Sequence, residues 1–495
     1  MILIMDIGTS STRGILFDKN GKEKWMDQIQ YQPTYFASVY VEQDPQDWIN
    51  AVCECVSRAQ QFASKNKQSI RAVAFTAQRS SLIPCDENGD PLRSAIMWQD
   101  RRNADIVKEL SKQNSWITSK TGARINTVYA AAKMTWLKRN EPAIYEKTYK
   151  LCSVADFIIH EMTGEFVTDE TYACRSLLAD VHSCHPDDKL CEYFEVDKEK
   201  ISTVMEPGSI VGYTTDQFFN KTKLPSGTPV ISCGGDQQCS ALGMGLVESG
   251  SVVITTGTGA FIMAYADHVP DVLDGQIVVE RHALKRTWAY ECSIPACAAL
   301  YNWANQIFFS KTQKEMADIN AAVMESKPGA NDIIVVPSFT GRGTPDWNTS
   351  AKGAFVNLTL GSTKQDMARA VIESIACEIA NNMETLSNYM NIPETILLTG
   401  GMTRFSTFDQ ILADTLGKKM KLIPAIIDPT ALGAWINASV CLKDYADAKE
   451  VFQKAVADYE IIEYQPNYDN YAIYKGKRLQ MKEIYESLYG KERGY

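Results

Sequence analysis

The residue best placed for chemistry is Asp236, which stands between two glycines and two glutamines in the segment 234–238. The apolar run 230–233 predicts a strand before it, and the small residues of 239–246 predict a helix after it. An aspartate at a strand-to-helix junction commonly caps the helix. It can also serve as a general base that takes a proton from a substrate hydroxyl. The residues around Asp236 leave both interpretations open.

Residues 6–13 form a second candidate site, because a glycine and four hydroxyl side chains follow an apolar strand expected over 2–5. Gly8 allows the backbone to approach an anion, and successive amides in such a turn can bind phosphate oxygens. Asp6, at the end of the strand, could hold Mg²⁺ through water, since Mg²⁺ keeps most of its waters. A plain hairpin turn favours the same residue types and remains an alternative.

Two further glycine turns follow apolar strands later in the chain. The turn 257–259 (Gly-Thr-Gly) comes after a strand expected over 251–256, and the turn 400–401 (Gly-Gly) follows one expected over 396–399. The strand, turn and strand of 251–265 echo the N-terminal pattern, which predicts a second, related half. Neither a P-loop motif nor a GxGxxG motif after the first strand is present, which disfavours a P-loop or Rossmann nucleotide site.

Arginine and tryptophan side chains follow two other expected strands. Arg79 comes after a strand expected over 70–76, and Trp98 lies in the segment 95–102. An arginine donates hydrogen bonds to hydroxyls, and a tryptophan offers a flat face to a sugar ring. Surface salt bridges and a packed tryptophan are the ordinary alternative, which these two residues alone favour.

The helices expected around these turns are amphipathic and pack on sheets. Asp44 is a favourable N-cap and Pro45 suits the first helical position, so a helix is expected to begin here. A long helix is expected over 364–390, and the small residues of 430–434 permit close packing of a last helix. No low-complexity linker interrupts the chain, so we expect two halves joined tightly, with a cleft between them.

The bulk composition bounds the class of protein. The 495 residues are too many for one ordinary core and suit two large domains. The net charge of −10 argues against a nucleic-acid partner, because binding to a phosphate backbone needs positive charge. Neither a signal peptide nor an apolar run of about 18 residues is apparent, which predicts a cytoplasmic protein without a membrane span. The 13 scattered cysteines are then expected to be reduced core thiols.

Taken in order, the motifs resemble those of the FGGY carbohydrate kinases, which are built on the actin-like, ribonuclease-H-like ATPase fold. The resemblance covers nearly the whole chain and is carried by DIGTSSTR (6–13), VEQDPQDW (41–48), AIMWQDRR (95–102), GGDQQCSALGMG (234–245), TTGTGAF (255–261), KGAFVNLTLGSTKQDMARAVIES (352–374), LLTGGMTRF (397–405) and TALGA (430–434). It implies an α/β protein with two ribonuclease-H-like domains. Residues 1–247 would bind the sugar and residues 248–495 the nucleotide.

The resemblance also implies roles for individual residues. Asp236 would be the catalytic base, and Asp6 and Asp236 would place Mg²⁺. The positions that would contact the sugar are Arg79, Ser80, Trp98, Asp236, Gln237 and Phe261. Those that would contact ATP are Thr9, Ser10, Ser11, Arg13, Thr258, Ala298, Asn302, Gly401 and Phe405. Ala298 stands where the family often has glycine, Asn302 where glycerol kinases have glutamine, and Phe405 near where they have asparagine.

The substrate positions depart from glycerol kinases, whose motifs this chain otherwise resembles most. Ser80 replaces the glutamate that follows the arginine in those enzymes, and Asn357 replaces a glycine. A tyrosine that contacts glycerol falls near Val128 or Tyr129. Losing a carboxylate acceptor removes a directional contact to substrate hydroxyls. We therefore expect an acceptor other than glycerol, such as the ketose xylulose or a four-to-six-carbon polyol.

The expected function is transfer of the γ-phosphate of MgATP to a hydroxyl of a small sugar or polyol. The resemblance suggests a homodimer or homotetramer, without nucleic acid or membrane partners. Two alternatives remain, which are a glycerol kinase proper and an actin- or chaperone-like ATPase that acts on a protein partner.

Overall fold

The computed structural model describes residues 1–309, 316–424 and 428–490. The chain divides into two units, and each is described by itself. The first unit consists of Met1–Glu248, Tyr265–Ala289 and Ile427–Asp458, and the second of Ser249–Ala264, Tyr290–Ile426 and Tyr459–Tyr495. The expected domain boundary after residue 247 stays a prediction.

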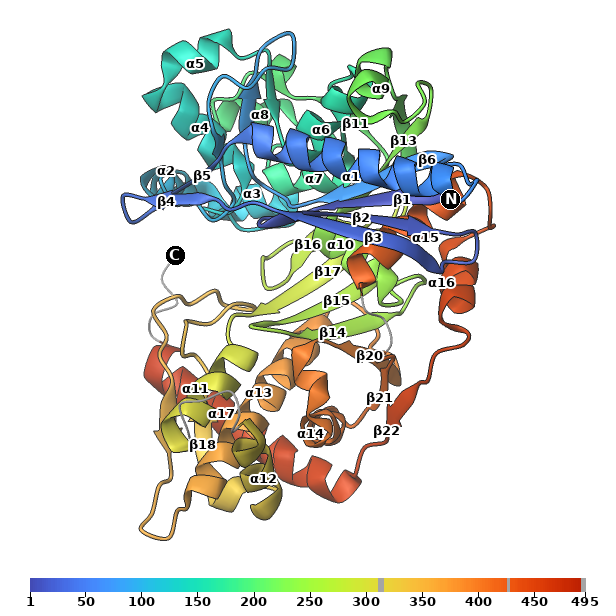
Figure 1. Cartoon of the computed structure of the whole chain (residues 1–495). Helices are drawn as coiled ribbons and strands as arrows, with labels where there is room; N and C mark the ends of the chain where they lie inside the picture. Colours follow the sequence, from blue (N-terminus) through green and yellow to red (C-terminus); the bar gives the residue numbers. More distant parts are fainter. Residues whose placement is uncertain (310–315, 425–427, 491–495) are drawn as a thin grey trace. The chain divides into compact units, whose positions relative to one another are not determined.

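A mixed six-stranded sheet forms the centre of the first unit (Figure 1). β1 pairs with β2 and β2 with β3 in antiparallel fashion, whereas β1 and β13 each run parallel to β6. The chain thus begins with a meander of three antiparallel strands. The sheet order is β12 (Ser209–Tyr213), β13 (Pro229–Gly235), β6 (Ala72–Ala77), β1 (Ile2–Ile7), β2 (Ser11–Phe17) and β3 (Glu23–Gln30).

Helices cover both faces of this sheet (Figure 1). α1 (Pro45–Lys65) packs on β1, β2 and β3, and α15 (Pro429–Cys441) packs on β1, β6 and β13. The predicted start of α1 is confirmed, because Asp44 accepts a hydrogen bond from the Gln46 amide and Pro45 is the first helical residue. The buried face of α1 carries Trp48, Val52 and Val56, which join the main apolar core of the unit.

The rest of the first unit surrounds this sheet with shorter elements. They are β4 (Thr34–Phe36), β5 (Tyr40–Gln43), β7 (Ile83–Cys85), β8 (Ala95–Ile96), α2 (Ala104–Leu110), α3 (Asn114–Thr121), α4 (Ala130–Asn140), α5 (Pro142–Lys147), β9 (Lys150–Cys152), α6 (Val154–Thr163), β10 (Val167–Asp169), α7 (Glu170–Ser176), α8 (Asp188–Tyr193), β11 (Thr203–Met205), α9 (Asp216–Thr222), α10 (Asp236–Gly243), β16 (Val278–Arg281) and α16 (Ala448–Val456).

The second unit repeats the strand, glycine turn and strand of the first. β14 (Val252–Thr256) pairs with β15 (Ala260–Ala266) in antiparallel fashion and with β20 (Thr395–Thr399) in parallel fashion. Its other described elements are β17 (Trp288–Ile294), α11 (Ala298–Phe308), α12 (Met316–Glu325), β18 (Ile334–Val336), β19 (Ala354–Val356), α13 (Lys364–Leu386), α14 (Ser406–Leu416), β21 (Lys419–Leu422), β22 (Ile462–Tyr464) and α17 (Tyr468–Tyr489).

The long helix α13 is the core of the second unit. It begins with a capping box, in which Thr363 and Asp366 bond each other's backbone amides, and it packs on α11, α12, α14 and α17. It ends at Leu386 rather than at the expected residue 390. No helix in the described residues is long and apolar enough to cross a membrane. All 13 cysteines are free, as expected for reduced thiols.

The helix α10, which carries Asp236, is held unusually close to α15. A Cβ at Gly433 would lie 1.8 Å from the Cys239 carbonyl oxygen, and a Cβ at Gly243 would lie 1.9 Å from the Pro429 carbonyl oxygen. Neither backbone oxygen can give way without moving its helix. The small residues of 430–434 therefore permit close packing, as predicted, and fix α10 against α15.

We predict that Gly433→Ala destabilises the first unit, because the added methyl group must push α10 and α15 apart. Overpacking of this kind costs about 1–3 kcal/mol or more of unfolding free energy. Urea unfolding should show a lower midpoint and activity should fall with it. The matched control is Gly476→Ala in α17, where a Cβ meets nothing within 4 Å. This change should stabilise by about 0.5–1 kcal/mol. An unchanged midpoint in Gly433→Ala would contradict the close contact.

A buried carboxylate in the second unit offers a test of charge burial. Asp409 on α14 is fully buried, and neither of its oxygens has a hydrogen-bond partner of ordinary geometry among the described residues. Burial raises the pKa of Asp409 to about 8, and the Tyr464 hydroxyl lowers it only in part. The folded chain thus keeps a proton that the unfolded chain releases near pH 4.

We predict that stability falls as pH rises from about 4 to 8, because in that range the folded state binds more protons at Asp409 than the unfolded state does. Unfolding free energy at pH 7 should be lower than at pH 4 by a few kcal/mol from this group, on the order of 1.4 kcal/mol per pKa unit. Asp409→Asn should remove that slope, whereas the same change at exposed Asp271 should keep it. If the unfolding free energy of wild type and of Asp409→Asn changes with pH in the same way, the buried carboxyl does not contribute the predicted loss of stability.

Candidate active site

Asp236 is the first residue of α10, directly after β13. Gly235, not Asp236, is the N-cap, and its extended backbone (φ −63°, ψ 156°) ends the strand. The Asp236 carboxylate accepts a hydrogen bond from the neighbouring Gln237 amide at 2.8 Å. The capping interpretation of Asp236 is therefore wrong, because the helix begins three residues before the expected residue 239. The carboxylate stays 29% exposed and open to a ligand.

The environment of Asp236 makes it a stronger base than an ordinary carboxylate. Burial raises the pKa of Asp236, while the Arg79 guanidinium and the Gln237 amide lower it in part. Arg79 Nε lies 3.4 Å from Asp236 Oδ1. A Cβ on Gly235 would come within 2.5 Å of Arg79 Cδ, so only glycine lets Arg79 pass over the start of α10.

Arg79 also pairs with a second carboxylate, that of Glu280 on β16. Both Glu280 oxygens lie 3.3 Å from Arg79 Nη1, and Glu280 Oε2 lies 3.3 Å from Arg175 Nη1. Arg175 Nη1 donates to the Tyr129 hydroxyl at 3.2 Å, and its guanidinium lies 4.6 Å from the centre of that ring. Tyr129 thus contacts the Arg79 network through Arg175, and whether it corresponds to the glycerol-contacting tyrosine stays a prediction.

The turn after β1 is held by side chains from other strands. The Gly8 carbonyl accepts from the Tyr31 hydroxyl at 2.9 Å and from Gln78 Nε2 at 3.2 Å. Trp98 Nε1 donates to Thr9 Oγ1 at 3.0 Å, so the indole N–H is used within the protein. Ser10 is exposed at the tip of the turn, and the half-exposed Ser11 Oγ accepts from Gln28 Nε2 at 2.7 Å. The backbone of this turn is therefore fixed before any ligand arrives.

Arg13 lies between two carboxylates. It pairs with Asp6 and, through Nη1 at 2.6 Å, with Asp428 Oδ2. Burial raises the pKa of Asp6 to about 6 against the opposing effect of Arg13, and the charges of Asp428 and Asp236 raise it further. Asp428 is also the N-cap of α15, because it accepts from the Ala431 amide at 3.0 Å. This side of the first unit thus places Asp428 and Asp236 within electrostatic reach of Asp6.

In the second unit, the two glycine turns meet. Gly400 has φ +106°, and a Cβ there would lie 2.4 Å from the Thr256 carbonyl oxygen, so it must remain glycine. Thr256 Oγ1 donates to the Thr399 carbonyl at 2.9 Å. The turn 257–259 that follows Thr256 and Gly401 that follows Gly400 therefore come together at one edge of this sheet.

The start of α11 closes the turn 257–259 from the other side. The Ala298 amide donates to the Gly257 carbonyl at 2.9 Å, and the Ala299 amide to the Thr258 carbonyl at 3.1 Å. These hydrogen bonds leave the Thr258 side chain exposed. Asn302 is exposed one turn further along α11.

An aromatic contact links α11 to the segment after β20. The ring of Phe405, which follows the 3-10 helix η5 (Gly401–Arg404), lies 6.4 Å from that of Tyr301 on α11. The predicted nucleotide residues of the second unit thus surround one turn. Phe261 lies on β15 of this unit and is 37% exposed.

Comparisons with known proteins identify the family. The N-terminal domain of the FGGY family of carbohydrate kinases matches residues 1–243, and its C-terminal domain matches residues 252–442. A glycerol kinase from Thermococcus kodakarensis is 31% identical over 458 residues, which cover 91% of this chain and 90% of that enzyme. This chain belongs to the FGGY family of carbohydrate kinases. It is therefore a phosphotransferase that uses ATP with Mg²⁺ and an alcohol group as acceptor.

Solved structures of FGGY kinases share the fold. A xylulose kinase from Rhodospirillum rubrum superposes with a TM-score of 0.92 at 22% identity, over 99% of both chains. A gluconate kinase from Lactobacillus acidophilus gives 0.90 at 24% identity, also over 99% of both. The predicted two-domain α/β, ribonuclease-H-like fold is thus confirmed. The cleft between the domains stays a prediction.

The structure gathers the predicted site residues into one group in each unit. In the first unit, Arg79 contacts Asp236, and Trp98 contacts the Thr9 turn. Ser80 is buried with φ +69°, and Gln237 is exposed beside Asp236. Nothing in the geometry assigns a ligand to each residue, so their individual roles stay predictions.

Four of the residues that contact the predicted site residues were not predicted from the sequence: Gln78, Arg175, Glu280 and Asp428. Asp428 had a local signal, because an aspartate before Pro429 at the first helical position is a typical helix start. Glu280 had none, since it lies 201 positions from Arg79 in the sequence.

The first-unit carboxylates fit a magnesium ion that keeps most of its water. Asp6 and Asp428 offer only oxygen donors, beside the hydroxyl-rich turn of Thr9 and Ser10, which is the chemistry that Mg²⁺ prefers. Among the described residues, no group of three acidic, histidine or cysteine side chains forms a ready metal cage. One or two carboxylates plus phosphate oxygens and water are the usual set for a nucleotide-bound Mg²⁺.

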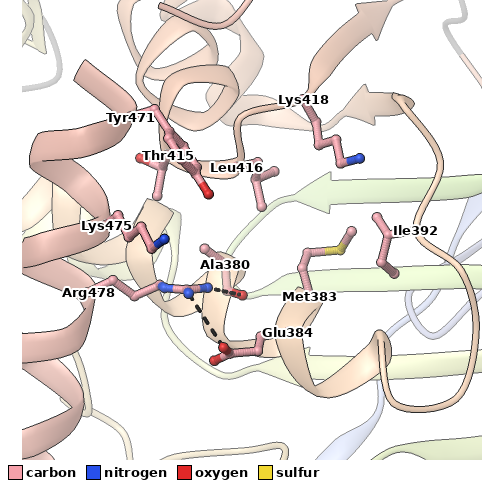
Figure 2. Close-up of a pocket in the computed structure, with 10 residues that line it drawn as sticks. All are labelled: Ala380, Met383, Glu384, Ile392, Thr415, Leu416, Lys418, Tyr471, Lys475 and Arg478. Carbon is pink, nitrogen blue, oxygen red and sulfur yellow. Dashed lines mark hydrogen bonds and ion pairs between the residues drawn. The ribbon is translucent and has the colours of Figure 1, made fainter. Parts of the chain in front are cut away.

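The second unit has a separate surface cavity of about 160 Å³ (Figure 2). It is bordered by α13 and α17, and Arg478 there donates to the Ala380 carbonyl at 3.2 Å and pairs with Glu384 at 3.6 Å. Lys418, which also lines the cavity, pairs with Glu394. None of the predicted site residues lines this cavity, so it is not the candidate active site.

Proposed function

We propose that this FGGY kinase transfers the γ-phosphate of ATP to a hydroxyl of a ketose such as xylulose or of a four-to-six-carbon polyol, in preference to glycerol. The observation that carries the proposal is the partly exposed Asp236 carboxylate beside the Arg79 guanidinium. Asp236 supplies the base, and Arg79 supplies a donor that positions a substrate oxygen.

In the proposed reaction, Asp236 accepts the proton of the substrate hydroxyl. The hydroxyl oxygen forms a bond to the γ-phosphorus while the bond from that phosphorus to the β-γ bridging oxygen breaks, and ADP leaves. Such a transfer needs positioning, charge neutralisation and one base rather than a covalent intermediate. The raised pKa of Asp236 suits this step, because a stronger base takes the proton more readily.

The other predicted residues hold the nucleotide. Thr9, Ser10 and Ser11 present hydroxyls and backbone amides, and Thr258 presents a hydroxyl from the second unit. Asp6 would hold Mg²⁺ through water, and that ion would neutralise charge on the phosphates. Arg13 keeps Asp6 oriented and prevents a buried carboxylate from standing unpaired.

The donors around Asp236 bear on the choice of acceptor. Arg79 and the exposed Gln237 can both donate, and Ser80 provides no carboxylate in place of the glutamate of glycerol kinases. A donor-rich site suits a substrate with an oxygen that only accepts, which a ketose carbonyl is. We also propose a cytoplasmic homodimer or homotetramer with domains 1–247 and 248–495, in line with the family resemblance.

A glycerol kinase proper is the second candidate, favoured by the 31% identity to the Thermococcus kodakarensis enzyme. An ATPase that acts on a protein partner would share the nucleotide turns. It would not need Arg79 beside Asp236.

We predict that a ketopentose or a four-to-six-carbon polyol gives the largest kcat/KM in an ADP-release screen that also includes glycerol, ketohexoses and sugar acids. The expected preference over glycerol is at least about tenfold, because a missing or mispaired hydrogen bond costs about 1–3 kcal/mol. Glycerol as the best acceptor would establish the second candidate. ADP release that does not change with any of these acceptors, but increases when a protein partner is added, would overturn the kinase proposal.

We predict that Asp236→Asn folds and binds ATP normally but loses transfer, since an amide cannot take the proton. The expected fall in kcat is about 10²–10⁴-fold, the usual contribution of a general base. Steady-state kinetics and calorimetric ATP titration measure the two effects. The same substitution at exposed Asp105 on α2 serves as the control and should change neither. Turnover near the wild-type rate in Asp236→Asn would remove Asp236 from the mechanism.

A further inference from the structure

We propose that Glu280 takes over the role of the glutamate that Ser80 replaces. It fixes Arg79 in the acceptor subsite and makes that subsite electrically neutral. Glu280 is then a positioning residue that favours uncharged polyhydroxy acceptors over sugar acids. This inference rests on the proposed kinase function and names the residue that sets its acceptor class.

The first observation is the burial of Glu280. Its side chain is only 3% exposed, and a carboxylate so deep in the protein is costly unless it is paired. Two guanidinium groups do this, because both oxygens lie 3.3 Å from Arg79 Nη1 and one lies 3.3 Å from Arg175 Nη1. These distances leave room for the hydrogen bonds to tighten when a ligand excludes water.

The second observation is the orientation that Glu280 gives to Arg79. The guanidinium turns Nη1 toward Glu280 and Nε toward Asp236, so two edges of the planar group are fixed. Arg79 remains 10% exposed, which leaves part of the group for a substrate oxygen. Removing Glu280 frees the guanidinium to turn toward Asp236 and to compete for the base.

The third observation is that Ser80 cannot orient Arg79 or balance its charge. Its hydroxyl lies 3.5 Å from the Arg175 carbonyl and carries no charge. A cavity of about 40 Å³ lies beside it, bordered among others by Ser80, Tyr172 and Arg175. A longer side chain at position 80 therefore has room to extend toward the Arg175 side of the network.

The charges of the network sum to zero. Asp236 and Glu280 each bring a negative charge, and Arg79 and Arg175 each bring a positive one, all within ion-pair distance of a neighbour. A sugar acid would need an unpaired guanidinium to offset its carboxylate. With both arginines already paired, an uncharged acceptor avoids the cost of burying an extra negative charge.

The test measures acceptor KM, ATP KM and kcat in Glu280→Gln, which keeps the shape of the side chain and removes its charge. We expect the KM for the best neutral acceptor to rise at least about tenfold, with ATP KM unchanged within about twofold. The inhibition constants of a six-carbon sugar acid and of the matching polyol should shift in favour of the acid, because one positive charge is set free.

The matched control is Glu170→Gln. Glu170 pairs with Arg281 at 2.6 Å, and this ion pair also joins α7 to β16, with side chains 8% and 3% exposed. The change removes a carboxylate that is also buried and also pairs across α7 and β16, but that is paired with Arg281 instead of Arg79. It should lower thermal stability and leave acceptor KM as in the wild type.

The double variant Ser80→Glu/Glu280→Gln tests rescue. Position 80 already has a positive φ, so the longer side chain adds no new backbone strain. We expect the returned charge to recover a large part of the acceptor KM, which a purely structural role of Glu280 would not permit. Acceptor KM that stays at the wild-type level in Glu280→Gln, or no recovery in the double variant, would overturn the inference.

The wild-type rate separates the two hypotheses. If the wild type shows acceptor-dependent ADP release and Glu280→Gln has an unchanged acceptor KM, the proposed role of Glu280 is wrong but the proposed function stands. Absence of acceptor-dependent release with every sugar and polyol sinks the proposed function, and the role of Glu280 with it.

Discussion

The first unit depends on one constraint, which is that each reactive carboxylate must share a guanidinium with a second carboxylate. Arg13 joins Asp6 to Asp428, and Arg79 joins Asp236 to Glu280. A buried charge without a partner is far costlier than the pair, so these carboxylates can remain inside only together with their arginines. The pairing favours the charged form of Asp236, which its proposed role as a base requires, while burial keeps its pKa above the ordinary value.

The backbone provides the space that this charge network requires. Glycine at 235 lets Arg79 pass over the first turn of α10, and glycine at 433 lets α15 approach α10 closely. The second contact packs α15 against α10, so that Pro429, next to the N-cap Asp428, lies against Gly243 at the end of α10. Side chains at either position would move the carboxylates apart and leave an arginine with only one partner. The geometry of the site is therefore set by residues that carry no chemistry of their own.

The sequence predicts those parts of the structure that local patterns specify. Asp44 and Pro45 mark the start of α1, and the strand, glycine turn and strand patterns mark both hairpins, because capping and turn residues act over a few positions. The start of α10 was missed, since its first turn is polar and the apolar pattern begins only at Cys239. The partnership of Arg79 with Glu280 could not be predicted at all. It joins residues 201 positions apart, and a glutamate in the strand segment 278–281 looks like any exposed strand residue until β16 is found buried against α7.

The position in the chain that supplies the carboxylate partner of Arg79 determines which polar groups the proposed subsite presents to a substrate. A glutamate directly after Arg79 would stand beside the guanidinium and could accept a hydrogen bond from a hydroxyl itself. Glu280 pairs with the guanidinium and is only 3% exposed, so it would act on a substrate through Arg79. In the proposed mechanism, the exposed part of the subsite would then offer donors, with Asp236 as the charged acceptor for the reacting hydroxyl. A small triol carries only hydroxyls and has no carbonyl to match to the donors, whereas a ketose would match one carbonyl to the donors and one hydroxyl to the base. The deeper position of the carboxylate thus gives a physical reason for the proposed substrate range, in which a ketose is preferred to glycerol.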